Sequence, residues 1–312
     1  MRAWMTVRQK HRLVLAVKAL IVAVLLFDLA VLLPATRLVV FALLEGGLRC
    51  PLSAALRTHG ATNEFASTWD RLKGQVRLIR REPGRDLWET PRGPTWFPSG
   101  SDSVLPYNMA EQELRIYGDD RLGVRPGDVV LDCGAHVGLY TREALRQGAR
   151  LVVAIEPSPE NLDCLRLNLS GELAAGRLII YPKGVWDREV YLPLHIPPQN
   201  SAGSSLVAAP IEGEKVVNVP FTTIDNLVAE LRLDRVDFIK MDIEGAERRA
   251  LAGARQTLAT YKPRLAIAGY HLPDDHLAIP AAVRGAWRGY GMTCRVCTYR
   301  GRSMVPEVLF FY

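Results

Sequence analysis

The chain has 312 residues, more than one average domain needs and fewer than two full domains with an anchor would use, so we expect one large domain with an extension. Its composition is that of a globular protein, and its net charge of +6 is uneven. Residues 1–100 carry 15 Lys and Arg against 7 Asp and Glu, a net of +8, and the remainder carries 24 against 26, a net of −2. No zinc-finger, RNP or helix-turn-helix pattern accompanies the basic third, so no nucleic acid partner is expected.

Cysteine is sparse in this chain. The five cysteines are Cys50, Cys133, Cys164, Cys294 and Cys297. Their irregular spacing is not that of a disulfide scaffold and indicates a reducing compartment. Cys294 and Cys297 form a lone C-x-x-C without the second ligand pair that a zinc site needs, so we expect two buried strand residues there.

The first fifty residues are apolar and basic. The run from Leu13 to Leu33, "LVLAVKALIVAVLLFDLAVLL", is long enough to cross a bilayer as a helix, although Lys18 and Asp28 interrupt it. Basic residues precede it, as on a cytoplasmic side: Arg2, Arg8, Lys10 and Arg12. The run from Leu38 to Leu48 is too short to span, which leaves a re-entrant or interfacial hairpin open. We therefore expect membrane association through residues 13–48, and not a cleaved signal peptide.

The next segment is a lead-in to the main domain. Between Gly60 and Pro126, short apolar groups alternate with Pro and Gly, which predicts irregular or strand-rich structure and no second folded domain. No internal repeat is visible. The expected organisation is a membrane-associated segment over residues 1–50, a lead-in over 51–126 and the main domain over 127–312.

From Val129 onwards, strands and helices alternate, which predicts a parallel sheet with helices on both faces. The expected strands are Val129–Cys133, Leu151–Glu156, Leu178–Val185, one in "VVNVPFTTIDNL", Val236–Met241 and Arg264–Tyr270. The first expected helix follows the glycine turn and ends near Gln147. The others cover Pro159–Leu169, Ala246–Leu258 and Pro280–Gly289. The last two apolar runs, Met292–Tyr299 and Val305–Tyr312, have no helix between them and predict an antiparallel hairpin at the sheet edge.

The stretch "VVLDCGAHVGLYT", Val129 to Thr141, is a strand, a glycine turn and a helix start. Turns of this kind lie at the carboxyl edge of the sheet, where Gly134 and Gly138 would let a ligand approach bare backbone. The helix expected to begin near Val137 favours a carboxylate or phosphate, whereas Asp132 would repel a phosphate. A ligand with both an ammonium and a carboxylate fits this pattern better.

Glu156 closes the next strand, 24 residues after Asp132, in the place where an acid accepts both ribose hydroxyls of a nucleoside. The two acids thus frame an adenosine with an amino-acid tail. "CGAHVG" lacks the middle glycine of G-x-G-x-x-G, so a dinucleotide is the weaker interpretation, and a tight structural loop remains the alternative.

The motifs together resemble a known family. "VVLDCGAHVGLYT", "VVAIEPSPENLDCLRLNL", "FTTIDNL", "VDFIKMDIEGAERRALAGA" and "YHLPDD" are similar, in order and spacing, to the FkbM family of S-adenosylmethionine-dependent methyltransferases. The likeness covers residues 127–312. It implies a Rossmann-like class I methyltransferase fold, with a seven-stranded, mostly parallel sheet that ends in the hairpin. It also implies S-adenosylmethionine as methyl donor and a hydroxyl oxygen as the usual acceptor.

Within this resemblance, the donor-binding residues follow from position. Gly134, Ala135 and Gly138 are expected to line the methionine part, and Glu156 to hold the ribose. Asp132 is expected to orient the ammonium directly or through water. The residues after the third strand are expected to lie beside the adenine ring: Val185, Trp186 and Asp187. Ordinary core packing is the alternative for Trp186.

The candidate catalytic residues follow two later strands. His271 is the expected base, with Asp242 as its orienting acid or as an alternative base, and a structural role remains open for the histidine. Lys240 could neutralise an acidic substrate or pair with carboxylates. Glu244 and Glu247 stand at the start of a helix, where their negative charges interact favourably with the helix dipole. A metal site at these acids would lack a clear ligand set, so no metal is expected. "NSAGSSL", residues 200–206, is expected near the acceptor pocket or as a solvated connection.

The sequence therefore predicts a membrane-associated O-methyltransferase that acts on a sugar, a lipid-linked glycan or another amphiphilic small molecule. Because the donor is made in the cytosol, the catalytic domain is expected there. The alternatives are methyl transfer to nitrogen or carbon, and a non-catalytic adaptor that retains the nucleoside pocket. Nothing in the sequence specifies the oligomeric state.

Overall fold

The computed structural model describes residues 7–32, 34–44, 47–207, 211–300 and 303–312. The helices are α1 (Val7–Leu32), α2 (Pro34–Leu44), α3 (Leu52–Lys73), α4 (Val104–Glu113), α5 (Leu139–Arg146), α6 (Pro159–Asn168), α7 (Ser170–Ala174), α8 (Ile224–Glu230), α9 (Glu247–Ala252), α10 (Arg255–Tyr261) and α11 (Asp275–Ala286), with a 3₁₀ turn at Ser201–Gly203. The strands are β1 (Arg77–Glu82), β2 (Arg85–Glu89), β3 (Thr95–Pro98), β4 (Val129–Cys133), β5 (Leu151–Ile155), β6 (Leu178–Tyr181), β7 (Gly184–Val185), β8 (Val190–Ile196), β9 (Lys215–Thr222), β10 (Phe238–Met241), β11 (Arg264–Ala268), β12 (Met292–Cys294), β13 (Cys297–Arg300), β14 (Ser303–Pro306) and β15 (Val308–Phe311).

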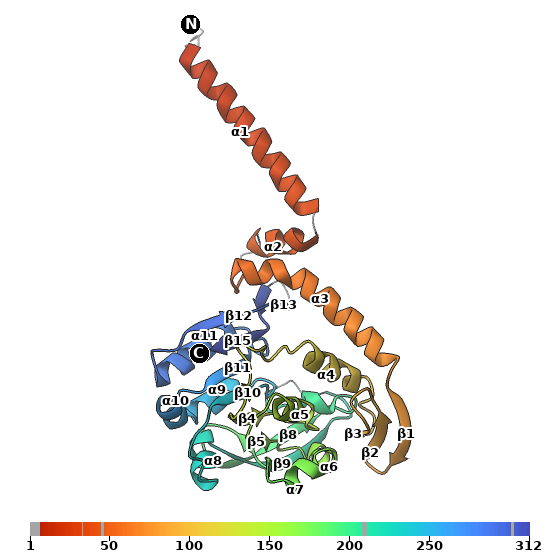
Figure 1. Cartoon of the computed structure of the whole chain (residues 1–312). Coiled ribbons are helices and arrows are strands. Elements are labelled where there is room, and N and C mark those ends of the chain that lie inside the picture. The colour runs from red at the N-terminus through yellow and green to blue at the C-terminus, as the bar shows by residue number, and fades with distance from the viewer. Residues whose placement is uncertain (1–6, 33, 45–46, 208–210, 301–302) are drawn as a thin grey trace.

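The main domain is built on a seven-stranded sheet with the order β12-β15-β11-β10-β4-β5-β6 (Figure 1). The pairs from β11 to β6 are parallel, and β15 runs antiparallel to both of its neighbours. This is the class I methyltransferase-like α/β fold that the resemblance implied, with a mostly parallel sheet and an antiparallel edge.

Alternate residues of the central strands pack into two separate hydrophobic cores, one on each face of the sheet, because successive side chains of a strand point to opposite faces. Leu131 and Ile239 pack on one face with α8, α9, α10 and α11. Val130 and Phe238 pack on the other with α5 and α6. All five residues of β4 are buried, which explains its continuous apolar run, interrupted only by Asp132.

Several elements differ from the expected ones. The strand expected over Leu178–Val185 ends at Tyr181, and β7 instead joins β8 and β9 in a second, three-stranded sheet. The helix expected over Ala246–Leu258 is divided at Gly253, because that glycine packs so closely on the backbone oxygen of Trp186 that a Cβ would lie 2.2 Å from it. The C-terminal runs form the expected antiparallel edge, but each is bent, so that β12 and β15 pair within the main sheet while β13 and β14 form a hairpin of their own.

The lead-in is more helical than expected. Besides the antiparallel sheet β1-β2-β3, it contains the long helix α3 and the helix α4, which pack on each other. Leu72, Phe97 and Leu105 share a core with Val137 and Cys164 of the main domain. The side chain of Asn168 also bonds to both backbone groups of Trp96, at 2.7 and 2.9 Å. The lead-in therefore packs directly against the main domain.

The N-terminal segment corrects the membrane prediction. No helix of the described part of the chain is long and apolar enough to cross a membrane. This finding overturns the expected membrane-spanning run over residues 13–33 and the membrane-associated location inferred from it; Arg2 and Leu33 lie outside the described residues. Helix α1 points away from the body, whereas α2 lies against α3 (Figure 1). Val39 and Ala42 of α2 are buried against Ala54 and Ala55 of α3, so these two residues of the second apolar run pack on protein, whereas Leu44 is exposed.

The cysteine prediction is wrong at one pair. Cys50, just before α3, forms a disulfide with Cys297 of β13, across 247 residues of sequence. Cys133, Cys164 and Cys294 are free and buried. A bridge between an isolated pair gives no spacing pattern, because its two halves meet only when the hairpin β13-β14 packs against α2 and α3. The disulfide links the segment between α2 and α3 covalently to β13, at the edge of the main domain.

Candidate functional site

The glycine turn after β4 brings two loops into contact. Gly134 has φ +81°, and a Cβ there would lie 2.0 Å from the backbone oxygen of Asp242. Gly138 has φ +89°, and its Cβ would lie 2.5 Å from Leu165 of α6. Contacts within the protein therefore require both glycines, and the approach of a ligand to Gly134 stays a prediction. The helix begins two residues later than expected, at Leu139.

Two neighbouring hollows open at this edge of the sheet. The inner hollow has about 570 Å³ of free space, part of it open solvent, and is lined by Gly134, Glu156 and Val185, with apolar walls from Leu194 and Phe221. The outer hollow has about 1360 Å³ of free space, part of it open solvent. Its polar lining residues include Glu111, Tyr117, Lys240, Asp242, Glu244 and His271. Both have residues in common on their walls: Gly134, His136, Ala202, Asp242 and Glu244. A ligand in one hollow can therefore contact a ligand in the other.

Glu156 lies at the back of the inner hollow, directly after β5, and is 4% exposed. One carboxylate oxygen accepts hydrogen bonds from Ser158 N and Asn161 Nδ2, and the other accepts one from His136 N at 2.8 Å. Burial raises the pKa of Glu156, although these hydrogen bonds oppose the shift. Within the described residues, the second oxygen accepts only the hydrogen bond from His136 N, and Asn161 Oδ1 is buried without a partner, so both retain capacity to bind hydroxyls or amines.

Asp132 does not reach either hollow. It is completely buried, accepts a hydrogen bond from Thr141 at 2.6 Å, and its other oxygen lies 3.4 Å from Lys240 Nζ. Lys240 in turn donates to the backbone oxygen of Gly134 at 2.9 Å. Burial lowers the pKa of Lys240, but the carboxylates of Asp132, Asp242 and Glu111 outweigh it and raise the pKa. Lys240 thus stands between Asp132 and the outer hollow, so direct contact between Asp132 and a donor ammonium is not supported.

The three residues expected beside the adenine ring lie in different surroundings. Val185 lines the inner hollow, whereas Trp186 packs edge-on against Phe221 outside it. Asp187 bonds to Arg249 at 2.7 Å and lines neither hollow. Ala135 lines the outer hollow only. Of the expected donor residues, the inner hollow therefore gathers Gly134, Glu156 and Val185.

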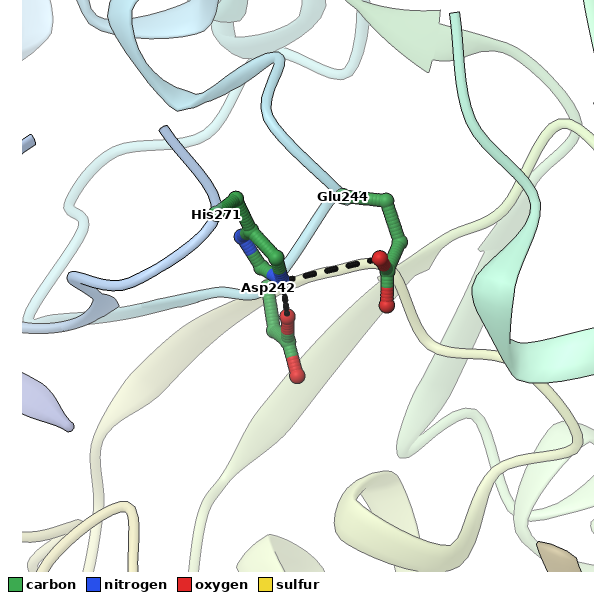
Figure 2. A group of neighbouring side chains, drawn as sticks. All are labelled: Asp242, Glu244 and His271. Carbon is green, nitrogen blue, oxygen red and sulfur yellow. Dashed lines mark ion pairs between the residues drawn. The ribbon is translucent and has the colours of Figure 1, made fainter. Parts of the chain in front are cut away.

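A cluster of carboxylates and an imidazole lies where the hollows meet (Figure 2). Asp242, Glu244 and His271 each offer one ligand atom, all within 4.8 Å of one another. His271 Nε2 lies 3.4 Å from Asp242 Oδ1 and 3.6 Å from Glu244 Oε2, and its Nδ1 donates to Glu247 Oε1 at 3.0 Å. The backbone of Glu244 is left-handed, with φ +54°, in the loop between β10 and α9. The cluster thus joins His271 and Asp242, two of the three expected catalytic residues, whereas the third, Lys240, pairs with Asp132.

The electrostatics of the cluster follow from burial and like charges. Burial lowers the pKa of His271, but the hydrogen bond to Glu247 and the carboxylates of Asp242 and Glu244 raise it to about 9. Burial and Asp242 raise the pKa of Glu244 to about 7. More negative groups therefore gather here than a single imidazole can balance.

The outer hollow also contains residues that the sequence did not reveal. Tyr117 donates a hydrogen bond to Asp242 Oδ2, and Tyr270 stacks under Arg300, whose guanidinium lies 4.7 Å from the ring. Burial and Asp242 raise the pKa of Glu111 to about 8. Tyr117 and Glu111 lie in the lead-in, where no motif marks them. His136 was open to detection, because it lies inside the glycine motif itself.

The comparisons with known proteins agree with the motif evidence. The sequence profile of the methyltransferase FkbM domain matches residues 132–291, which is 160 of the 312 residues. The chain belongs to the FkbM family of methyltransferases. It is a S-adenosylmethionine-dependent methyltransferase, and the family and fold imply S-adenosylmethionine as the methyl donor.

Individual relatives are distant. The chain is 27% identical over 244 residues to the 31-O-demethyl-FK506 methyltransferase FkbM of Streptomyces tacrolimicus, covering 67% of this chain and 90% of the relative. The crystal structure of methyltransferase FkbM from Methylobacillus flagellatus KT is similar with a TM-score of 0.45 and 20% identity over 82% of this chain, which spans 60% of that protein. A precorrin-6y C5,15-methyltransferase from Geobacter metallireducens GS-15 has a TM-score of 0.36 and 14% identity, over 64% of this chain and 85% of that one.

Proposed function

We propose that this FkbM-family methyltransferase transfers the methyl group of S-adenosylmethionine to a hydroxyl oxygen of an amphiphilic small molecule, such as a sugar or a lipid-linked glycan. One observation supports this most: the inner hollow, bounded by Glu156, and the polar outer hollow have Gly134, Asp242 and Glu244 in common on their walls. A donor in the first and an acceptor in the second can then meet.

The inner hollow fits the donor. Its apolar walls, which include Leu194 and Phe221, suit an adenine ring. Glu156 and Asn161 are proposed to hold the ribose with their remaining acceptor capacity, and Val185 to contact the base. Gly134, Ala135 and Gly138 are proposed to shape the turn beside the methionine part, and Asp132 acts on it only through Lys240 or a water. When bound, the donor supplies a methyl group from its sulfonium, becoming a neutral thioether as the carbon–sulfur bond breaks and the carbon–oxygen bond forms.

The outer hollow fits the polar end of an acceptor. Asp242 is proposed to hold the acceptor hydroxyl and take up its proton. His271, whose pKa of about 9 keeps it protonated near neutral pH, is proposed to orient that carboxylate and to act as the base itself only at higher pH. Lys240 is proposed to position Asp132 and the turn. Alignment of the oxygen with the methyl carbon contributes up to about 7 to 11 kcal/mol, and a positioned base adds roughly 10²- to 10⁴-fold in rate, so placement is the larger effect.

An apolar groove supports an amphiphilic acceptor. This groove runs between α3 and the hairpin end of the main sheet, is lined by Phe65, Ile116 and Phe310, and encloses about 1290 Å³ of solvent-continuous space. Trp69 and Tyr107 line both the groove and the outer hollow. An acceptor with a hydroxylated head in the outer hollow could therefore extend an apolar tail along the groove. The name of the curated relative, which denotes methylation of a demethylated oxygen, favours oxygen over nitrogen or carbon as the methylated atom.

The test is methyl transfer by the purified full-length chain from isotope-labelled S-adenosylmethionine into fractionated sugars, glycolipids and polyketides, with NMR of the product to identify the methylated atom. We expect donor binding by calorimetry and label on an oxygen. Label on nitrogen or carbon would overturn the O-methylation proposal. Donor binding without transfer to any fraction would favour the adaptor alternative.

A further inference from the structure

We propose that Asp242, Glu244 and His271 form a binding site for one divalent cation, of the kind that accepts both carboxylate oxygen and imidazole nitrogen, such as Mn²⁺. The site lies at the junction of the inner and outer hollows (Figure 2). The sequence analysis expected no metal, because the acids after β10 lacked a clear ligand set and the histidine is distant from them in sequence.

The first argument is a buried nitrogen without a hydrogen-bond partner. The His271 side chain is 91% buried, with a relative exposure of 9%, and its Nε2 has no hydrogen-bond partner among the described residues. Asp242 Oδ1, 3.4 Å from it, is also buried and accepts no hydrogen bond from this part of the chain. In Figure 2 the imidazole edge faces both carboxylates. Buried polar atoms are normally satisfied, so a pair of them face to face indicates a ligand between them.

The second argument is the orientation of the imidazole. Glu247 is completely buried, accepts a hydrogen bond from His271 Nδ1, and is itself held by the backbone N–H of Ile243 at 2.9 Å. Histidines that bind metals usually donate their other ring N–H to a carboxylate in this way. Without a metal, a proton on Nε2 faces the two carboxylates, since the pKa of His271 is raised to about 9. A divalent cation would displace that proton and bind the Nε2 lone pair and both acidic oxygens in its place.

The third argument is spacing. The distances from Nε2 to the two carboxylate oxygens, 3.4 and 3.6 Å, exceed the ~2.7 to 2.9 Å of a charge-assisted hydrogen bond. Ligands about 2.1 Å from a metal lie roughly 3.0 Å apart in an octahedron and roughly 3.4 Å apart in a tetrahedron. The two distances from Nε2 are therefore close to those of ligands around one ion, and the two carboxylate oxygens, within 4.8 Å of each other, would move together on binding.

The neighbouring cations are engaged elsewhere. Lys240 binds Asp132 and the oxygen of Gly134, and Arg300 stacks on Tyr270. Within the described part of the chain, neither forms an ion pair with Glu244. Tyr117 occupies the other oxygen of Asp242, which leaves Oδ1 for a cation. Two carboxylates and one imidazole suit Mn²⁺, because it accepts hard oxygen ligands and tolerates nitrogen.

The role of the ion rests on the proposed function. Its place on the wall of the outer hollow would let it contact the acceptor hydroxyl, and a bound divalent ion lowers the pKa of a coordinated oxygen. The hydroxyl proton would then leave to water as the oxygen bonds to the methyl carbon. His271 would act as a ligand in this case and not as the base.

The test uses the chelator-treated full-length chain and Mn²⁺ alone, with bound ion measured by electron paramagnetic resonance. We expect one Mn²⁺ per chain, and affinity at least about tenfold weaker in Glu244→Gln and His271→Ala. Glu247→Gln is a positioning variant and should weaken binding roughly 10- to 100-fold without removing a ligand. Glu214→Gln is the matched control, because Glu214 also bonds to a histidine, His195 at 2.7 Å, but away from the cluster.

Circular dichroism and donor calorimetry on the same samples separate the possible failures. Absence of Mn²⁺ binding up to about 1 mM in a folded chain that binds the donor overturns the cation site and leaves the methyltransferase proposal standing. Unchanged Mn²⁺ affinity in the three cluster variants has the same consequence, since the ion would then bind elsewhere. Mn²⁺ binding without donor binding would instead contradict the proposed donor site.

Discussion

At the scale of single residues, the buried Glu156 carries the strongest donor prediction. Replacing it by alanine should weaken S-adenosylmethionine binding by about 1.5 to 3 kcal/mol, or roughly 10- to 150-fold, because charge-assisted hydrogen bonds to the ribose are lost. Isothermal titration calorimetry measures this change. Glu160→Ala is the control, since Glu160 lies nearby in α6 but pairs with Lys215 at the surface. Equal affinities for Glu156→Ala and the unaltered chain would exclude Glu156 as the ribose ligand.

Gly134 carries a prediction about stability. Its alanine variant should lower the free energy of unfolding by more than about 1 to 3 kcal/mol, because the backbone is left-handed and a Cβ would overlap the Asp242 oxygen. Gly171→Ala is the control, with no atom within 4 Å of the added Cβ, and should stabilise by about 0.5 to 1 kcal/mol. Urea unfolding of the two variants checks both signs. A neutral Gly134→Ala would show that the loop after β10 moves aside.

Sequence alone predicted part of the site at this scale. Gly134, Glu156 and Asp242 were found because they end parallel strands, and such ends meet at one edge of a sheet. Tyr117 was not found, because its bond to Asp242 spans 125 residues and depends on how the lead-in folds over the sheet. The trio with Glu244 and His271 was missed for a similar reason: the two segments approach only through the neighbouring strands β10 and β11.

At the scale of elements, the disulfide couples the N-terminal helices to the sheet edge. Cys50→Ser should lower the free energy of unfolding by about 2 to 5 kcal/mol, because the bridge closes a long loop and restricts the unfolded chain. Denaturation in urea measures this loss. A reductant should weaken the unaltered chain by a similar amount and leave Cys50→Ser unaffected. If the reductant destabilises both equally, the effect does not come from this bridge.

The strands of the main sheet were predictable, and the helix α3 was not. Continuous apolar runs such as β4 indicate strands buried on both faces, so the parallel order follows from the sequence. The buried face of α3 consists largely of small or polar residues: Ala54, Ala55, Thr58 and Thr68. The helix also contains the exposed Gly60, a residue with low helix propensity. Such a face gives little hydrophobic periodicity. The helix is stabilised by packing on α2 and α4, which no local pattern records.

At the scale of the whole molecule, two hollows and a groove form one path for substrates. Trp69→Ala should raise the KM for an acceptor with a long apolar part by roughly 5- to 150-fold, the effect of losing about 1 to 3 kcal/mol of apolar contact. Donor affinity should stay the same, since Trp69 does not line the inner hollow. Steady-state kinetics with long and short acceptors make the comparison. Tyr191→Ala, which removes an aromatic ring 68% exposed on β8, is the control. Equal effects on long and short acceptors would argue against the groove as the tail site.

The bond between Cys50 and Cys297 also has a consequence for biosynthesis. A ribosome adds about 5 to 20 residues per second, so the second cysteine follows the first by roughly 12 to 50 seconds over the 247 intervening residues. During that interval the thiol of Cys50 has no native partner, although the strands β4 to β11 are already being synthesised. Closure of the bridge therefore has to wait until nearly the whole chain has been made.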